Sequence, residues 1–190
     1  MRPGAILPFV RCRSPEPRDR RRREPAPMNS PHDGVDIARL PPQEVVEASH
    51  ELNDVQRHAF AVEAALIGDY RIPQLGESAE LLIAKSLTWH VAWTKTAIVA
   101  AIAYSDIGSS LEVDRLFVAP SWHRRGLARR LILSLGSGPI DVSTGRENQP
   151  ARWLYESLGF SHLDDTEALP SLWLSRYQRQ GRPPVPTLHR

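Results

Sequence analysis

The sequence predicts a single-domain α/β (α+β) fold with a central, mostly antiparallel mixed sheet of six to seven strands and helices on both faces. Three observations support this prediction. Residues 89–118 show period-two alternation and short apolar runs divided by turn residues, which is typical of consecutive antiparallel strands. Residues 44–67 and 121–135 carry apolar residues at helical spacing. The chain has 190 residues, 41% of them hydrophobic, which is enough for one packed core.

Along the chain, a short strand is expected first, at residues 35–40. Residues 44–67 are rich in Ala, Glu, Gln and Leu, which predicts one or two amphipathic helices that end at Gly68. A loop at 69–78 and another helical turn or two within 77–86 follow. The other expected elements are strands at 89–93, 98–104 and 111–118, the helix up to Gly136, strands at 140–143 and 160–163, a helix at 147–158, and a closing strand at 172–177.

Positive charge is concentrated at the start of the chain. Residues 1–27 hold eight Arg against three acidic residues, whereas residues 28–190 hold sixteen basic and nineteen acidic residues, a net charge of −3. Residues 1–30 are expected to be a disordered basic extension, 31–178 the folded domain and 179–190 a polar tail. The extension is interpreted as a basic arm, a targeting peptide or sequence upstream of a true start at Met28, and we favour the third.

Composition argues against several classes of protein. The apolar run at residues 97–103 is far shorter than the roughly 18 residues that span a bilayer, so no membrane partner is expected. Cys12 is the only cysteine, which excludes an intramolecular disulfide and a cysteine metal cluster and fits a cytoplasmic location. The histidines are too scattered to predict a metal site.

The segment most informative about function follows the strand at 111–118. Backbone amides near residues 124–128 precede the next helix and are not used by its hydrogen bonds, so they can converge on a phosphate. Gly126 leaves room for a pyrophosphate, and the nearby arginines add positive charge. As a bare pattern, the same residues also describe a solvated, Arg-rich helix after a turn, because neither a Walker loop nor a dinucleotide fingerprint is present.

Two motifs frame this loop. The strand ends Leu116-Phe117-Val118, and the loop reads His123-Arg124-Arg125-Gly126-Leu127-Ala128. These residues resemble the GNAT superfamily of N-acyltransferases, in which a hydrophobic-aromatic-Val strand end precedes Gln/Arg-x-x-Gly-x-Gly/Ala. His123 stands where Gln or Arg is usual, so weaker or differently shaped contact with the coenzyme is expected there. The resemblance covers about residues 35–178 and implies acetyl-CoA as acyl donor, bound by Phe117, Val118, His123, Arg124, Arg125, Gly126, Leu127, Ala128, Arg129 and Asn148.

The second match is Asn148 followed by a segment that carries Tyr155 and ends Gly159-Phe160, with the full family spacing. The resemblance implies that the backbone at Phe117 and Val118 pairs with the pantetheine amides like an added strand. It also implies that Asn148 holds the pantetheine arm and that Tyr155 protonates the departing thiolate. The alternative for Tyr155 is a core tyrosine with its hydroxyl at the surface.

For the general base we select Glu112, which lies on the strand that leads to the site. It precedes Asp114 by two residues, so both carboxylates are expected on one face. The alternative is that Glu112 or Asp114 faces solvent or pairs with Arg115 or Arg125.

The expected function is N-acetyl transfer from acetyl-CoA to a primary amine of a small molecule or protein, by direct attack in a ternary complex and without a metal. Residues 28–190, with their net charge of −3, favour a cationic acceptor. The residues that select the acceptor are expected in the helical region 44–87 and the loop 164–170. Two other functions stay open: a catalytically silent acyl-CoA-binding regulatory module, and an RNA- or ribosome-associated protein that uses the basic arm. The main interpretation includes no nucleic acid partner. A homodimer is suggested only by the resemblance to the family.

Overall fold

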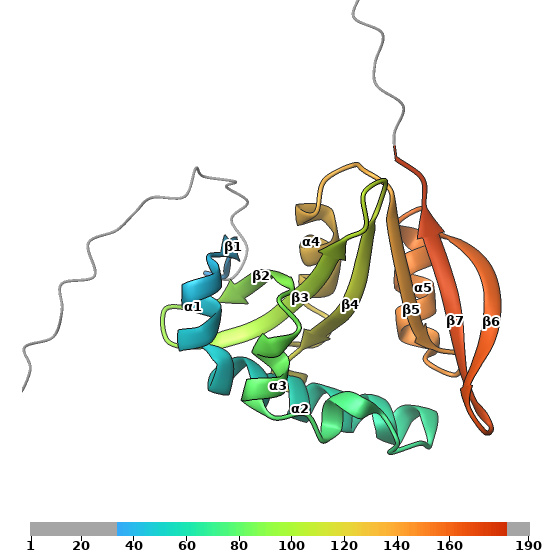
Figure 1. Cartoon of the computed structure of the whole chain (residues 1–190), viewed down its shortest axis with the longest axis horizontal. Helices are drawn as coiled ribbons and strands as arrows, with labels where there is room; N and C mark the ends of the chain where they lie inside the picture. The colour runs from blue at the N-terminus through green and yellow to red at the C-terminus, as the bar shows by residue number, and fades with distance from the viewer. Residues whose placement is uncertain (1–33, 182–190) are drawn as a thin grey trace, which may run out of the picture. The chain divides into compact units, whose positions relative to one another are not determined.

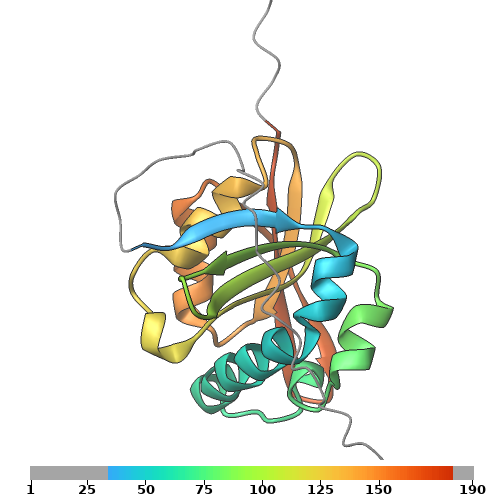
Figure 2. The same ribbon diagram turned by 90° about the vertical axis from the view of Figure 1, so that its left-hand side faces the viewer.

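The computed structural model describes residues 34–181. The expected basic extension at 1–30, with its start at Met28, lies outside the described residues, as does most of the expected tail. The described chain forms a seven-stranded sheet in the order β1-β2-β3-β4-β5-β7-β6, with helices on both faces (Figure 1, Figure 2). All neighbouring strands are antiparallel except β4 and β5, which confirms the predicted mixed sheet.

The expected strands and helices are present, with ends shifted by a few residues. In chain order they are β1 (Asp36–Leu40), α1 (Pro42–Glu47), α2 (Ser49–Ile67), the 3-10 turn η1 (Pro73–Leu75), α3 (Ala79–Ala84), β2 (Thr88–Trp93), β3 (Ile98–Asp106), β4 (Leu111–Val118), the 3-10 turn η2 (Pro120–Trp122), α4 (Leu127–Ser134), β5 (Ile140–Gly145), α5 (Gln149–Ser157), β6 (Ser161–Leu169) and β7 (Leu172–Arg179).

Two expectations about the last strands are wrong. The strand at 172–177 does not close the sheet, because β7 lies between β5 and β6 and leaves β6 at the edge. The loop expected at 164–170 is instead the second half of β6 and the start of the turn after it. Every residue of β6 is exposed, so the strand depends on its ladder to β7 and shows no apolar alternation in the sequence.

Each face of the sheet buries its own apolar cluster. On one face, α4 and α5 contribute Leu131 and Tyr155 to a cluster that includes Ile102 of β3. On the other face, α1, α2 and α3 pack around a second cluster that includes Leu52 and Trp89. Figure 2 shows the two sets of helices on opposite sides of the sheet. The site described below therefore has one layer of helices on each side.

A β-bulge changes the direction of side chains along β4. Val113 pairs with Tyr104 and Arg115 pairs with Ala103, which leaves Asp114 as an extra residue. Val113 consequently packs in the α4–α5 cluster, whereas the side chain of Arg115 points to the α2 face. Val113 and Arg115, two residues apart, therefore lie on opposite faces of the sheet, and the sequence did not indicate the bulge.

Arg115 anchors α2 and the segment before α3 to β4. Its side chain is fully buried, and its guanidinium hydrogen-bonds Gln56 of α2 at 2.7 Å. It also pairs with Asp114 at 2.7 Å and forms an ion pair with Glu77. For Asp114, the structure therefore contains the alternative named from the sequence, an ion pair with Arg115. Burial opposes ionisation of Glu77, but hydrogen bonds from Arg115 and Gln56 outweigh it and hold the pKa of Glu77 below its usual value.

No helix within residues 34–181 combines the length and the apolar character that a membrane crossing needs.

The first prediction concerns this buried ion pair. Glu77→Gln is expected to lower the free energy of unfolding by about 3 kcal/mol, because it leaves a buried guanidinium with one carboxylate instead of two. Urea unfolding of both proteins measures the difference. Glu147→Gln is the control, because Glu147 pairs with Arg146 on the exposed surface and its loss should change stability little.

The destabilisation should depend on pH in a defined direction. Because the folded pKa of Glu77 is lowered, its contribution is fully present above the unfolded pKa of about 4.3 and is lost as pH falls through the folded value. The difference between wild type and Glu77→Gln should therefore shrink below about pH 4. An equal difference at pH 3 and pH 7 would show that the ion pair is not the cause.

Candidate active site

The site begins where β4 and β5 separate. The two parallel strands pair only over Leu111–Val113 and Ile140–Val142, and beyond these residues they diverge (Figure 1). From Arg115 to Val118, β4 keeps its pairing with β3 but has no strand beside it on the other edge. The backbone groups on this edge are therefore available to an extended ligand, which can pair with them as an added strand does.

Helices approach the diverging strands from both faces. α5 follows directly after β5 and packs in the cluster on one face. On the other face, the end of α2 reaches β5: Cγ2 and Cδ1 of Ile67 lie 3.4 and 3.5 Å from the position that a Cβ would take at Gly145. These are ordinary van der Waals distances, so the end of α2 lies directly against β5 at this glycine.

The loop between β4 and α4 presents unpaired backbone amides. Arg124 and Gly126 adopt left-handed conformations, with φ of 63° and 75°, and the first helical hydrogen bond runs from Arg130 N to Gly126 O. In the part of the chain that the structure describes, the N–H groups of residues 124–129 make no hydrogen bond. Such a turn at a helix N-terminus is suited to bind an anion, as the sequence predicted for a phosphate.

The side chains of this loop have different environments. Arg124, Arg125 and Arg129 are exposed, whereas Leu127 belongs to the apolar cluster below α4. The guanidinium of Arg125 lies 4.4 Å above the ring of Trp122, a cation–π contact that holds it over the loop. The predicted contribution of Leu127 to a binding site therefore rests on its backbone amide alone.

His123 fastens the loop to the end of β4. Its Nε2 lies 3.0 Å from the carbonyl oxygen of Val118, so the imidazole spans the turn that the loop makes. This contact gives a structural reason for His at the position where the resembled family has Gln or Arg.

Phe117 and Val118 use their side chains for packing. The ring of Phe117 is buried and meets Trp89 edge-on, with the ring centroids 6.3 Å apart. Val118 packs against the cluster on the opposite face. Their predicted role in binding a ligand therefore falls to the backbone.

Tyr155 lies on α5, with only 5% of its surface exposed. Its ring packs between Phe160 and Tyr177, at centroid distances of 5.6 and 5.8 Å. Burial, and secondarily the charge of Glu63, raise the pKa of Tyr155 well above its usual value, so the hydroxyl stays protonated. Within residues 34–181 this hydroxyl makes no side-chain hydrogen bond that would occupy its proton. It is a proton donor without a protein acceptor.

Asn148 caps α5. Its side-chain oxygen accepts a hydrogen bond from Ala151 N at 3.2 Å, which explains why this helix begins after Asn148. The contact of Asn148 with a pantetheine arm stays a prediction.

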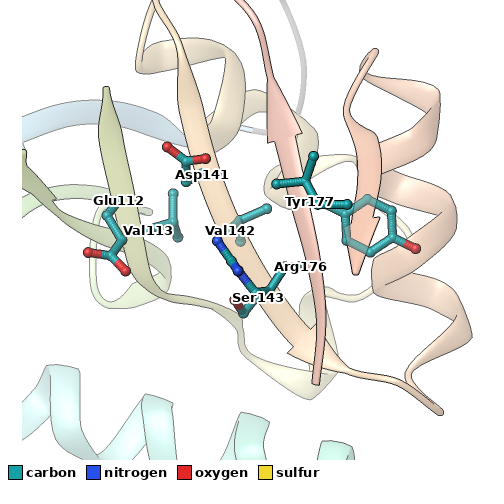
Figure 3. Close-up of a pocket in the computed structure, with 8 residues that line it drawn as sticks. Glu112, Val113, Asp141, Val142, Ser143, Arg176 and Tyr177 are labelled. Carbon is teal, nitrogen blue, oxygen red and sulfur yellow. The ribbon is translucent and has the colours of Figure 1, made fainter. Parts of the chain in front are cut away.

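Glu112 lies at a small polar pocket near the point where β4 and β5 part. The pocket has a volume of about 60 Å³, and its polar lining includes Asp141, Ser143 and Arg176 (Figure 3). In Figure 3, Arg176 extends across β5 toward Ser143, while Tyr177 points to α5. Glu112 and Asp141 are opposite one another in the β4–β5 ladder. Both acidic residues thus line one pocket, and in Figure 3 their carboxylates point in different directions.

These two carboxylates are in different hydrogen-bonding states. Asp141 accepts hydrogen bonds from Ser110 at 2.6 Å and from Gln178 at 2.8 Å. Glu112 is exposed and, among the described residues, has no hydrogen bond or ion pair. Arg176 is partly neutralised by Asp164 at 3.2 Å. The pocket therefore offers one free carboxylate in acidic surroundings, which favours a cationic guest.

Within the described part of the chain, no group of three or more His, Cys, Asp or Glu residues is arranged to hold a metal ion.

Comparison with known proteins gives a consistent result. Residues 85–162 match the family model described as "Acetyltransferase (GNAT) domain", a span that includes the β4–α4 loop and Tyr155. The chain is also 28% identical over 132 residues to the UPF0157 protein YqkA of Bacillus subtilis (strain 168). That alignment covers 67% of this chain but only 38% of the relative, so the chain spans well under two thirds of the length of YqkA.

Solved structures share the fold. One is the PaiA N-acetyltransferase of Thermoplasma acidophilum in complex with coenzyme A, with a TM-score of 0.62, 19% identity and coverage of 78% of this chain and 99% of that one. Another is the ribosomal-protein-S18-alanine N-acetyltransferase of Escherichia coli, with a TM-score of 0.62, 16% identity and coverage of 82% and 99%. YncA from Salmonella typhimurium with its cofactor acetyl-CoA has a TM-score of 0.56, 16% identity and coverage of 78% and 94%. At these identities the likeness concerns the fold, and it confirms the fold that the sequence predicted.

The second prediction concerns the left-handed residue before α4. Gly126→Ala is expected to lower the free energy of unfolding by about 1 kcal/mol, because a Cβ is strained at a φ of 75° although no atom lies within 4 Å of it. Thermal unfolding measures the change. Gly138→Ala is the matched control, since Gly138 also has open space around it but no positive φ. Equal stability of both variants would contradict the assigned backbone conformation.

Proposed function

Because residues 85–162 match the GNAT acetyltransferase domain and solved N-acetyltransferases share the fold, we propose that this chain transfers an acetyl group from acetyl-CoA to a primary amine by direct attack in a ternary complex. One observation carries the proposal. The unpaired edge of β4 runs from the polar pocket at Glu112 toward the free amides of residues 124–129, and the protonated Tyr155 lies on α5, the helix that follows β5. This arrangement supports a donor site, a proton donor and an acceptor site around the diverging strands.

The phosphate end and the pantetheine arm of acetyl-CoA fit different parts of this arrangement. The amides of residues 124–128 receive the pyrophosphate, and the exposed Arg124, Arg125 and Arg129 supply positive charge for the phosphates. The pantetheine arm pairs with the edge of β4 at Phe117 and Val118. PaiA with coenzyme A and YncA with acetyl-CoA share this fold, which supports the choice of donor.

The acceptor is proposed to be a cationic primary amine of a small molecule or a protein. Glu112 has no partner within residues 34–181, and the other charged groups of its pocket, Asp141 and Arg176, already have partners, so an ammonium group there meets one free carboxylate. The same charges lower the affinity for acidic acceptors. Glu112 draws the ammonium to the opening and remains the base that the sequence favours.

The transfer balances in protons and electrons. A base takes one proton from the ammonium, and the free lone pair attacks the thioester carbonyl carbon to form the C–N bond. The C–S bond then breaks, its electron pair stays on sulfur, and the Tyr155 hydroxyl protonates the thiolate. The second amine proton returns to Tyr155 through water, so the net products are an amide, free coenzyme A and one proton.

Two other functions make different predictions. A silent acyl-CoA-binding module binds the donor but releases no coenzyme A with any amine. An RNA- or ribosome-associated role depends on the basic arm at 1–30, which lies outside the described residues. Neither has an observation in the site that favours it over transfer, because neither uses the buried, protonated Tyr155.

The third prediction tests the donor site by calorimetry of acetyl-CoA with the full chain. Wild type should bind, and Gly126→Glu should weaken binding about 100-fold or more, because its carboxylate would face the pyrophosphate. Gly126→Ala is the control: it imposes the same backbone strain without the charge and should keep most of the affinity. A wild type that does not bind acetyl-CoA would refute the proposed donor.

The fourth prediction tests the proton donor. Tyr155→Phe is expected to lower kcat about 100-fold while leaving acetyl-CoA affinity and the unfolding temperature nearly unchanged, because the hydroxyl has no protein partner to lose. Release of free coenzyme A gives the rate. Tyr104→Phe serves as control, since Tyr104 lies on β3 beside His90, away from the opening. An unchanged kcat in Tyr155→Phe would assign Tyr155 to packing alone.

A further inference from the structure

The pocket at Glu112 also has a cationic side. Arg176 lies on β7 directly opposite Ser143 of β5, and its side chain extends across β5 toward Ser143 (Figure 3). Arg176 and Glu112 both line the pocket. Only β5 separates their strands, so their backbones lie about 10 Å apart in the direction across the sheet. A carboxylate from β4 and a guanidinium from β7 therefore border one small polar space.

Both of these groups have unused hydrogen-bonding capacity. None of the ion pairs within residues 34–181 includes Glu112. Arg176 donates one hydrogen bond, from Nη1 to Asp164 at 3.2 Å, and its Nε and Nη2 groups donate none to the residues that the structure describes. Because a guanidinium carries several N–H groups in a planar fork, Arg176 can bind a second anion beside Asp164.

The ion pair with Asp164 is weak enough to be shared or exchanged. Asp164 and Arg176 are opposite one another in the β6–β7 ladder, and their side chains are 50% and 52% exposed. Such a pair adds little stability, because water screens it and two long side chains have to be ordered to form it. An anion that is also held by other contacts can therefore compete with Asp164 for the guanidinium.

Two free groups of opposite charge in one pocket suit a guest that carries both charges. An ammonium pairs with Glu112, and an anionic group on the same molecule pairs with Arg176. A carboxylate suits this position better than a phosphate, because Asp141 lines the pocket and Asp164 contacts Arg176, and both repel a second negative charge. A polyamine has no anionic group, and its second ammonium is repelled by Arg176.

We propose that the acceptor is a zwitterionic amino acid, whose ammonium binds at Glu112 and whose carboxylate binds the free N–H groups of Arg176. This inference rests on the proposed function and narrows its acceptor. Such a molecule has no net charge, so the acidic surroundings oppose it less than an acceptor with a net negative charge. With its carboxylate toward β7, the nitrogen is directed to β4, whose free edge is the proposed place of the donor.

Nothing in the sequence singles out Arg176 as a binding residue. It lies far along the chain from Glu112, and only the strand order brings the two residues to one pocket. If β6 had followed β5 in the sheet, Arg176 would lie one strand further from Glu112. The insertion of β7 beside β5 is therefore what makes this side of the pocket cationic.

The fifth prediction compares amino acids with their uncharged carboxamides. L-Alanine, β-alanine and γ-aminobutyrate serve as acceptor probes for the full chain, each beside its amide, which has nearly the same shape without the negative charge. At least one of the three acids should show a kcat/KM about 10-fold higher than its amide, because only the carboxylate pairs with Arg176. Release of free coenzyme A gives the rates.

Arg176→Gln should abolish this preference. The KM of the preferred amino acid is expected to rise about 10-fold, whereas the KM of its amide should stay nearly unchanged. Arg57→Gln is the matched control, because Arg57 is an exposed arginine that lines a different hollow, between α2 and residues 75–80. This control should keep the preference of the wild type.

A second variant separates ligand binding from a structural role of the ion pair. Asp164→Asn also breaks the pair, but it leaves the guanidinium free for the ligand. The KM of the amino acid should therefore fall about threefold, opposite in direction to the change in Arg176→Gln. If the pair only supported the β6–β7 hairpin, both variants would change KM in the same direction, and equally for acid and amide.

The outcomes distinguish this inference from the proposed function. If wild type acetylates amines but none of the three amino acids exceeds its amide, or if Arg176→Gln keeps the preference, the amino-acid acceptor is wrong although the transfer stands. Spermidine as a better acceptor than all three amino acids would contradict it as well. If wild type binds acetyl-CoA but releases coenzyme A with no amine, the transfer itself is refuted, and the amino-acid acceptor with it.

Discussion

The site depends on one constraint, the early end of the ladder between β4 and β5. Two features of the sheet account for it. β5 stays paired with β7 along its whole length, from Ile140 to Gly145, so it follows β7. β4 stays paired with β3 and carries the bulge at Asp114, which increases local twist just where the β4–β5 pairing stops. Each strand follows its antiparallel neighbour, and the parallel pair between them separates.

The separation of β4 and β5 has several structural consequences for the site. It exposes backbone groups in the middle of a sheet, where they are normally paired, and so provides an edge for a ligand. It also lets a helix of the opposite layer reach β5, as α2 does where Ile67 lies against Gly145. The buried network of Arg115, Gln56 and Glu77 then has a clear consequence: it fixes α2 against β4.

Much of this arrangement could be predicted from the sequence. Apolar alternation identified β2, β3 and β4, and the spacing of Gly126, Asn148 and Tyr155 identified the loop and the helix of the site. The remaining parts have no local signal. The bulge at Asp114 depends on pairing with β3, the insertion of β7 depends on sheet order, and β6 has no buried face to produce a pattern.

The most direct test of this account is a crystal structure of the protein with coenzyme A. We expect the pyrophosphate on the amides of residues 124–128 and the pantetheine arm extended along the edge of β4 at Phe117 and Val118. The sulfur should then lie within reach of the Tyr155 hydroxyl. Coenzyme A bound elsewhere, with the space between β4 and β5 filled by side chains, would contradict the central claim that the separation of these strands forms the active site.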